Sequence, residues 1–242
     1  MNNAMKRAGW MGVATFLLWV AGCGPASVED GFVDPDKDLV SINGGVSVGR
    51  DAHVGDLESV NGSIRVGDNS QVGQVSNVNG STRLNPGARA EGIQSVNGSI
   101  TTDGVTVEGD VRSVNGGIRL NEGTSVGGKV SSVNGAMRLT GTTVVGDVIT
   151  YNGNIELFDG TRVRGDVRVE DSWDIDLSWD IDLGDIKINV SRPTIILHAG
   201  VKVEGKLRFD RDVHLWVHED ADIGEVTGAE VNRFSGDSPP RT

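Results

Sequence analysis

The sequence predicts an all-β fold, a single-stranded triangular β-solenoid (β-helix) with about 18 residues per coil. A tetrad of the type Ser-Val-Asn-Gly recurs along the chain at steps of 18 or 19 residues, and apolar residues recur every six positions within each step. Helical periodicity is missing, because glycine interrupts nearly every window. A sandwich or a barrel would not require an 18-residue copy of itself, so a stack of β-coils is the expected architecture.

The beginning of the chain is typical of a secretory signal. Lys6 and Arg7 form a positive start, and the apolar stretch that follows is shorter than the roughly 20 residues of a spanning helix. The run Val-Ala-Gly-Cys ending at Cys23, the sole cysteine, resembles the bacterial lipobox. We therefore expect residues 1–22 to be a lipoprotein signal peptide and Cys23 to carry the lipid.

The lipobox resemblance implies export and anchoring in the cell envelope through acyl chains such as palmitate. By the sorting rule of enteric bacteria, Gly24 in place of an aspartate favours the outer membrane, with the protein facing the periplasm or the surface. The formal net charge of −12 makes nucleic acid a poor partner. The expected partners are the membrane, through the lipid, and other envelope components or further copies of the chain end to end.

Residues 23–40 are predicted to be a short acidic tether. They include Pro25 and Pro35 and five acidic side chains, a composition typical of a flexible linker. The solenoid is expected to cover 41–226, with an irregular insertion near 171–192. Residues 227–242 are polar and are expected to form a tail or a cap, because the ends of a solenoid must be covered or charged.

Within the solenoid, the period of six predicts three short strands per coil. Side chains alternate along a strand, so each strand should point two residues inward. One side pairs two large residues (Ile64 with Val66), a second pairs a small residue with valine (Ser70 with Val72), and a third pairs Ser76 with Val78. After one inserted residue the inward frame should resume at Val133, Leu139, Val145, Tyr151, Leu157 and Val163.

The asparagine of each tetrad occupies one position in successive coils. Stacked in register, these side-chain amides could hydrogen-bond from coil to coil as an asparagine ladder. We expect the ladder to be a structural device of the corner, where asparagine and glycine tolerate unusual backbone angles, rather than a binding strip. Its members are Asn43, Asn61, Asn79, Asn97, Asn115, Asn134 and Asn152.

A duplicated hexapeptide interrupts the repeat at residues 172–183. Trp173 and Trp179 belong to its apolar side, and the other side carries Asp174, Asp176, Asp180 and Asp182. The segment could form an eighth coil or a strand or hairpin that leaves the coil path. Alternate carboxylates on a strand suit a solvated face, a loose calcium site or an acid–base pair. The tryptophans mark the expected ligand face, if the chain has one.

Three phrases resemble the coil motif of bactofilins, namely Val-Glu-Gly-Asp-Val at 107–111, Val-Gly-Asp-Val at 145–148 and Val-Arg-Gly-Asp-Val at 163–167. The whole region is also similar to the glycine-rich β-helical adhesin-type proteins of bacterial envelopes. The resemblance covers roughly 41–170 and, more weakly, 195–226. It implies a right-handed rather than a left-handed solenoid and, for bactofilins, end-to-end polymerisation; the lipobox favours an envelope role instead.

The sequence therefore predicts a lipid-anchored envelope protein with a structural, scaffold or adhesin-like role and no catalytic activity, metal or cofactor. One alternative is a calcium- or glycan-binding module that uses the Trp/Asp segment. A second alternative is a polysaccharide-acting β-helix enzyme, for which Asp174 and Asp180 would be the residues to test.

Overall fold

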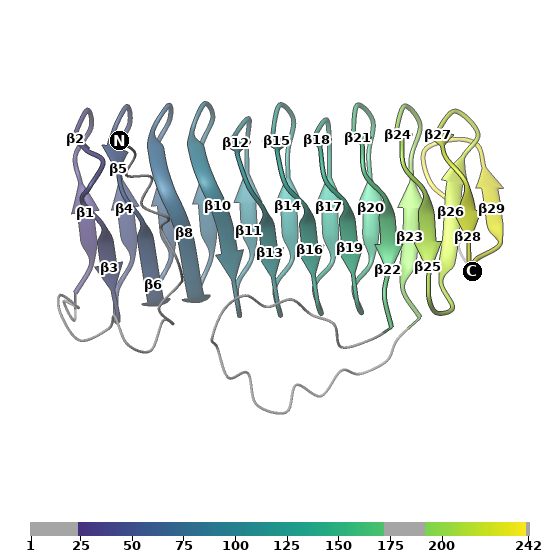
Figure 1. The fold of residues 1–242 in the computed structure, drawn as a ribbon, viewed down its shortest axis with the longest axis horizontal. Coiled ribbons are helices and arrows are strands. Elements are labelled where there is room, and N and C mark those ends of the chain that lie inside the picture. Colours follow the sequence, from purple (N-terminus) through teal and green to yellow (C-terminus); the bar gives the residue numbers. More distant parts are fainter. Residues whose placement is uncertain (1–23, 172–191, 241–242) are drawn as a thin grey trace, which may run out of the picture.

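The computed structural model describes residues 24–171 and 192–240, and within these ranges every regular element is a β-strand. The strands are two to nine residues long and pair only in parallel, each with the equivalent strand of the next coil. They build a β-solenoid of about ten coils (Figure 1). The predicted fold class is confirmed.

Each coil contributes one strand to each of three faces. Face 1 is a continuous eleven-stranded sheet whose strands alternate between a buried, an outward and a buried residue. Its strands are β1 (Ala26–Val28), β4 (Val46–Val48), β7 (Ile64–Val66), β9 (Thr82–Leu84), β11 (Ile100–Thr102), β14 (Ile118–Leu120), β17 (Met137–Leu139), β20 (Ile155–Leu157), β23 (Thr194–Leu197), β26 (His214–His218) and β29 (Val231–Phe234).

The other two faces are joined by two long strands, β8 (Gln71–Asn79) and β10 (Arg89–Ser95), which turn from one face to the next. Face 2 also contains β2 (Val33–Asp34), β5 (His53–Val54), β12 (Thr106–Val107), β15 (Ser125–Val126), β18 (Thr143–Val144), β21 (Arg162–Val163), β24 (Lys202–Val203) and β27 (Asp222–Ile223). Face 3 also contains β3 (Leu39–Ser41), β6 (Leu57–Asn61), β13 (Val111–Ser113), β16 (Val130–Ser132), β19 (Val148–Thr150), β22 (Val167–Val169), β25 (Leu207–Phe209) and β28 (Val226–Thr227).

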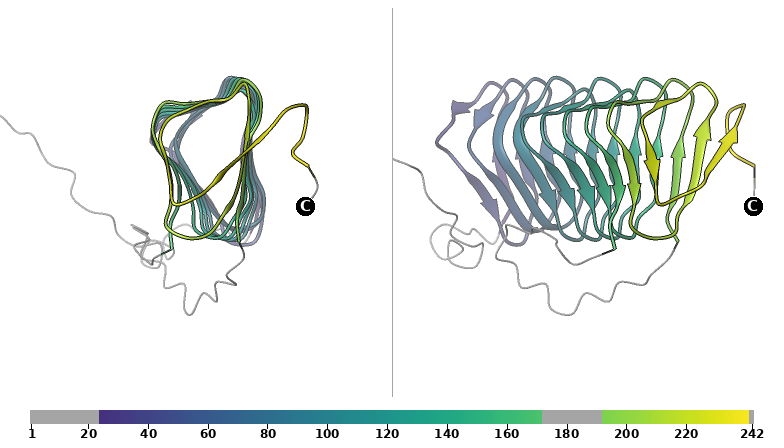
Figure 2. Two further views of the ribbon diagram at one scale, coloured as in Figure 1. Left: turned by 90° about the vertical axis from the view of Figure 1, so that its right-hand side faces the viewer. Right: turned by 45° about the vertical axis from the view of Figure 1, so that its right-hand side comes forward.

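Figure 2 shows the coils stacked along one axis. The core is an apolar column of buried side chains inside this stack. Face 1 supplies its largest side chains, such as Ile64 and Leu120, which are fully buried. Face 2 pairs a small residue with valine, as at Ser70 and Val72, so both of these predicted inward pairs are confirmed. A single coil cannot bury such a column, and stacking makes the core continuous.

The predicted core positions Ser76, Val78, Val145 and Tyr151 are wrong, because the turns vary in length; Thr150 takes the inward place expected for Tyr151. On face 3 the inward pair is Val75 with Asn77, one residue before the expected Ser76 and Val78. A one-residue shift along a strand reverses which side chains face the core. Val145 is 43% exposed and Val144 takes the inward place, because the turn after Leu139 is one residue shorter than the corresponding turn after Leu120.

The solenoid begins earlier than the sequence suggests. Residues 24–40, assigned above to the tether, form a first coil together with Ser41, and its strands β1, β2 and β3 pair in register with the second coil. Val28 and Leu39 are buried in the core, which explains why this acidic stretch is ordered as a coil. Residue 41, predicted above as the start of the solenoid, is therefore the end of its first coil.

The C-terminal end is covered. After β28 the chain crosses the end of the solenoid, packs Ala229 against the core and adds β29 to face 1 beside β26 (Figure 2). Phe234 of β29 is buried. The described residues after 227, predicted to be a tail or a cap, thus form a cap over the final coil.

The Trp/Asp insertion does not interrupt the stack. β20 pairs directly with β23, Ile155 opposite Ile195, and β22 pairs directly with β25. Equivalent residues on the two sides are 40 apart in sequence instead of 18 or 19. The described strands are therefore continuous across the insertion, whose residues 172–191 lie outside the described ranges.

Candidate functional site

The predicted asparagine ladder is present along its full length. Each amide nitrogen donates to the amide oxygen of the preceding coil, from Asn61 to Asn43 at 3.2 Å through Asn152 to Asn134 at 3.4 Å. Arg211 then donates to Asn152 Oδ1 at 3.2 Å and closes the C-terminal end of the ladder. Burial lowers the pKa of Arg211, and the nearby Asp171 partly offsets this effect.

The remaining polar residues of the tetrad serve the same corner. Ser113 Oγ donates to the carbonyl oxygen of Gly116 at 2.7 Å, three residues later, and closes the turn from inside. A Cβ atom on Gly116 would lie 1.9 Å from the carbonyl oxygen of Gly98, so the stacked corners leave room only for glycine. The whole tetrad is accounted for by folding, which agrees with the structural role predicted for the ladder.

The other predicted site residues lie outside the described ranges. These are the lipid attachment residue Cys23, the calcium candidates Asp174, Asp176, Asp180 and Asp182, and the ligand-face candidates Trp173 and Trp179. Within residues 24–171 and 192–240, no group of three His, Cys, Asp or Glu side chains is placed to hold a metal ion. No helix long and apolar enough to span a membrane occurs there either.

A second ladder, which the sequence analysis did not predict, runs along the corner before face 3. Asp110, Asp147 and Asp166 of the Gly-Asp-Val phrases each accept, through Oδ1, the backbone N–H of the equivalent residue one coil later. The distances are 2.7–2.8 Å. The aspartate of the Gly-Asp-Val phrase therefore has a structural function, which is to join coils at this corner.

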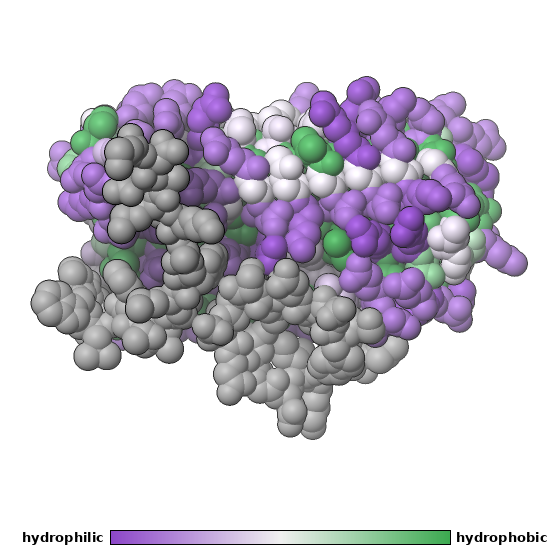
Figure 3. Space-filling model, in the orientation of Figure 1, coloured by the Kyte–Doolittle hydropathy of each residue, from purple (hydrophilic) through white to green (hydrophobic). Residues whose placement is uncertain are grey.

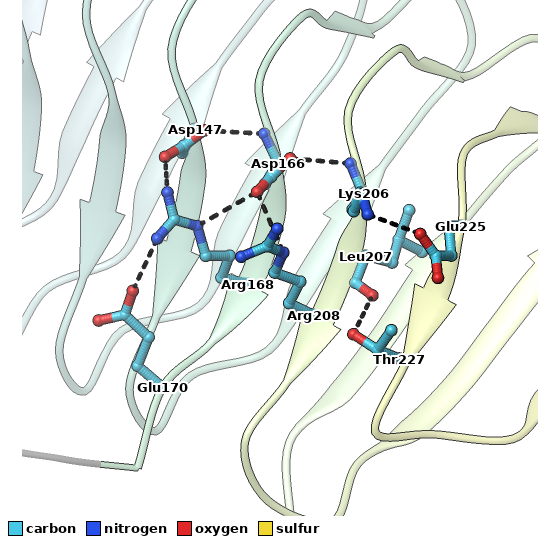
Figure 4. Close-up of polar contacts among 9 residues, drawn as sticks. All are labelled: Asp147, Asp166, Arg168, Glu170, Lys206, Leu207, Arg208, Glu225 and Thr227. Carbon is cyan, nitrogen blue, oxygen red and sulfur yellow. Dashed lines mark hydrogen bonds and ion pairs between the residues drawn. The ribbon is translucent and has the colours of Figure 1, made fainter.

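Basic side chains surround the C-terminal part of this aspartate ladder (Figure 4). Arg168 contacts Asp147, Asp166 and Glu170, and Arg208 lies 3.5 Å from Asp166. Arg168, Arg208 and Lys206 are thus each paired with acids of their own chain. A cluster that is internally neutralised offers little charge to a partner.

The outward surface of face 1 carries a different arrangement. The middle residue of each face 1 strand points outward, and parallel pairing places these residues in one straight column. Four members, which we call the arginine column, are Arg65, Arg83, Arg119 and Arg138. Thr101 separates the two arginine pairs. Neighbouring strands are about 4.8 Å apart, so the guanidinium groups form a narrow cationic row.

The members of the column differ in their partners. Arg83 pairs with Asp103 at 2.8 Å and Arg138 with Glu156 at 2.6 Å, and both arginine side chains are at least half exposed. Arg65 and Arg119 are exposed and form no ion pair with any residue in the described part of the chain. Two of the four positive charges are therefore available to a ligand without displacing an acid of the described residues.

A shallow groove of about 310 Å³ lies beside the column, over β11, β14, β17 and β20. Small residues, Ser99, Gly117 and Ala136, form one side of it because they immediately precede the face 1 strands. Arg119 and Arg138 line the other side. The groove gives a ligand access to the guanidinium groups from the flank as well as from above.

The column ends at Glu156. Besides Arg138, this carboxylate contacts His198 Nε2 at 3.2 Å. The His198 ring stacks on Phe158 with 4.4 Å between centroids, and Phe234 packs against His198 edge-on. Aromatic and apolar groups thus follow the arginines at the C-terminal end of the molecule.

The arginine column was not predicted, because net charge sums the charges of the whole chain and does not show which of them share a face. A positional reading would have found it, since each column arginine stands four residues after a ladder asparagine, as Arg65 does after Asn61. Comparisons of the chain with models of protein families, with curated proteins and with solved structures found no match. The interpretation of face 1 therefore depends on its geometry and charge.

Proposed function

We propose that this protein is a lipid-anchored scaffold of the bacterial cell envelope with an adhesin-like, non-catalytic role. A rigid prism held at Cys23 would present its lateral faces to a partner. The observation that carries the proposal is the exposed arginine column, a cationic row on one face of a chain whose net charge is −12. Charge segregated in this way is typical of a binding surface.

Rigidity supports a presenting role. Hydrogen-bonded ladders run along two corners, and the core is continuous from the first coil to the cap. The face toward the viewer in Figure 3 is largely hydrophilic, with small separate apolar areas. Of the described residues, only Val33, Val145 and Val231 are exposed large hydrophobic residues, and they are scattered. Recognition on these faces would therefore be polar or ionic.

The charge of the two ends disfavours the end-to-end polymerisation that a bactofilin-like scaffold would need. Both terminal coils are acidic, and like charges that face each other repel. The first coil carries Glu29, Asp30, Asp34, Asp36 and Asp38 against Lys37. The last coil and cap carry Glu219, Asp220, Asp222, Glu225 and Glu230 against Arg233.

Sedimentation velocity and negative-stain microscopy of residues 24–242, without lipid and at micromolar concentration, test the proposal. We expect a monomer at low and at physiological salt. Filaments under these conditions would contradict the proposed role of the lateral faces and favour a polymerising scaffold. To test the localisation, the wild-type chain and a Cys23→Ser variant are expressed at full length in a bacterium. Only the wild-type chain is expected in the membrane fraction.

A further inference from the structure

We infer that face 1 binds a linear anionic polysaccharide, one that bears carboxylate or sulfate groups, along the arginine column. The inference rests on the proposed function, because it names the partner that the lateral surface would take. It assigns the contact to Arg65, Arg83, Arg119 and Arg138. The glycan-binding alternative of the sequence analysis used a different segment, the Trp/Asp insertion.

Charge selects an anionic ligand. Arg65 and Arg119 have no ion-pair partner among the described residues. In the other two pairs the arginine side chains are 57% and 50% exposed, and their partners Asp103 and Glu156 are 28% and 24% exposed. Ion pairs that water reaches contribute little to stability, so an incoming anion can compete with the protein carboxylate for the guanidinium. The guanidinium group presents paired N–H donors that match a carboxylate or a sulfate, and its charge does not depend on pH.

The shape of the site selects a linear polymer. Parallel strands in register place the arginines on a straight line, and the gap at Thr101 divides them into two pairs. The groove beside Arg119 and Arg138 has the small residues Gly117 and Ala136 on its far side, so an extended chain can lie flat against the sheet. A single small anion would use only one or two members of the column.

The lack of aromatic residues on the strands of the arginine column argues against ligands that bind by stacking. The chain has no Phe, Trp or Tyr between Phe32 and Tyr151, which covers all four arginines and the strands that carry them. Single-stranded nucleic acids are bound by stacking bases on aromatic side chains. The strands that carry the four arginines supply none, and the nearby Phe158 ring already packs against Arg138 and His198. Neutral glycans would likewise lack a stacking platform here. Ionic recognition of a charged saccharide is the chemistry that remains.

The test measures binding of defined polymers to the full chain in a mild non-ionic detergent at low salt. The probes are polygalacturonate (carboxylate), dextran sulfate (sulfate), neutral dextran and oligo-deoxythymidine. Isothermal titration calorimetry measures the binding of each. The column variant is Arg65→Gln/Arg119→Gln. The matched control is Arg89→Gln/Arg164→Gln, which removes the same charge from exposed positions outside the column.

We expect at least one of the two acidic polysaccharides to bind, with a dissociation constant raised at least about tenfold in the column variant and less than about twofold in the control. Unchanged melting temperatures will show that both variants fold. Equal losses in the two variants, no binding of either acidic polysaccharide, or tighter binding of oligo-deoxythymidine would each overturn the inference. The sedimentation experiment on lipid-free residues 24–242 described above separates the two proposals, since a monomer there together with no polysaccharide binding here contradicts this inference alone.

Discussion

Asn97 Nδ2 donates a 3.1 Å hydrogen bond to Asn79 Oδ1 in the coil before it, and Asn97 Oδ1 accepts a 3.0 Å bond from Asn115 in the coil after it. Each interior asparagine of the ladder therefore makes two inter-coil bonds, whereas Asn43 at the N-terminal end makes one. The ladder ties adjacent coils together at the corner after face 3, where only Asn61 and Asn79 also belong to paired strands of the described residues.

Replacing an interior asparagine should cost more than replacing the first. Asn97→Ala removes two amide bonds, and we expect a loss of about 1–2 kcal/mol and a melting temperature lower by several degrees. Asn43→Ala removes one bond and should cost about half as much. Thermal unfolding followed by circular dichroism measures both variants. Equal effects in the two would mean that the ladder contributes through the unfolded state or the turn instead.

The glycine of the tetrad should tolerate no side chain. A Cβ on Gly98 would lie 1.8 Å from the carbonyl oxygen of Gly80, so Gly98→Ala must separate two coils and should cost about 1–3 kcal/mol or more. Gly117 is the control, because its nearest atom would be 3.3 Å away and the next coil already has Ala136 there. Urea unfolding of Gly117→Ala should stay within about 0.5 kcal/mol of the wild type.

The aspartate ladder should depend on its acceptor oxygen more than on its charge. Asp166→Ala leaves the backbone N–H of Lys206 without its 2.8 Å partner, which we expect to cost about 1–3 kcal/mol. Asp166→Asn keeps the oxygen and loses only the contacts with Arg168 and Arg208, so its cost should stay below about 1 kcal/mol. A comparable loss of melting temperature in both variants would assign the effect to the ion pairs.

Near the N-terminal end, a half-buried acid should destabilise the fold at neutral pH. Burial raises the pKa of Glu58 above its ordinary value of 4.5, and the carboxylates of Asp56 and Asp38 raise it further. A raised pKa means that the folded state favours the protonated form, so the ionised group opposes folding above that pKa, and acidification relieves the effect. Glu58→Gln should therefore raise the melting temperature at pH 7.

The gain should disappear as the pH falls through the raised pKa toward 4.5, because the wild-type carboxyl is then neutral as well. Glu91→Gln, which removes an exposed acid elsewhere, is the matched control and should change little at either pH. A gain in Glu58→Gln that persists unchanged at acidic pH would show that packing, and not charge, explains the stabilisation.

Much of this fold can be read from the residues because a solenoid repeats its local rules. A step of 18 or 19 residues predicted which asparagines meet, and the hydrogen bonds from Asn61 through Asn152 confirm it. Patterns failed where a turn changed length by one residue. Val145 and Val78 satisfy the period of six, yet the local turns place Val144 and Asn77 inward.

The sequence by itself determined the coil length, the all-β architecture and the ladder of asparagines, because each depends on contacts between residues one repeat apart. Only the tertiary structure decided where the solenoid starts and ends and which charges share a face. Arg65 and Arg119 are 54 positions apart in sequence and stand in one column because three coil steps bring their strands into register. Net charge sums over every face, and stacking sorts charges among faces, so the cationic column appears only after the coils are stacked.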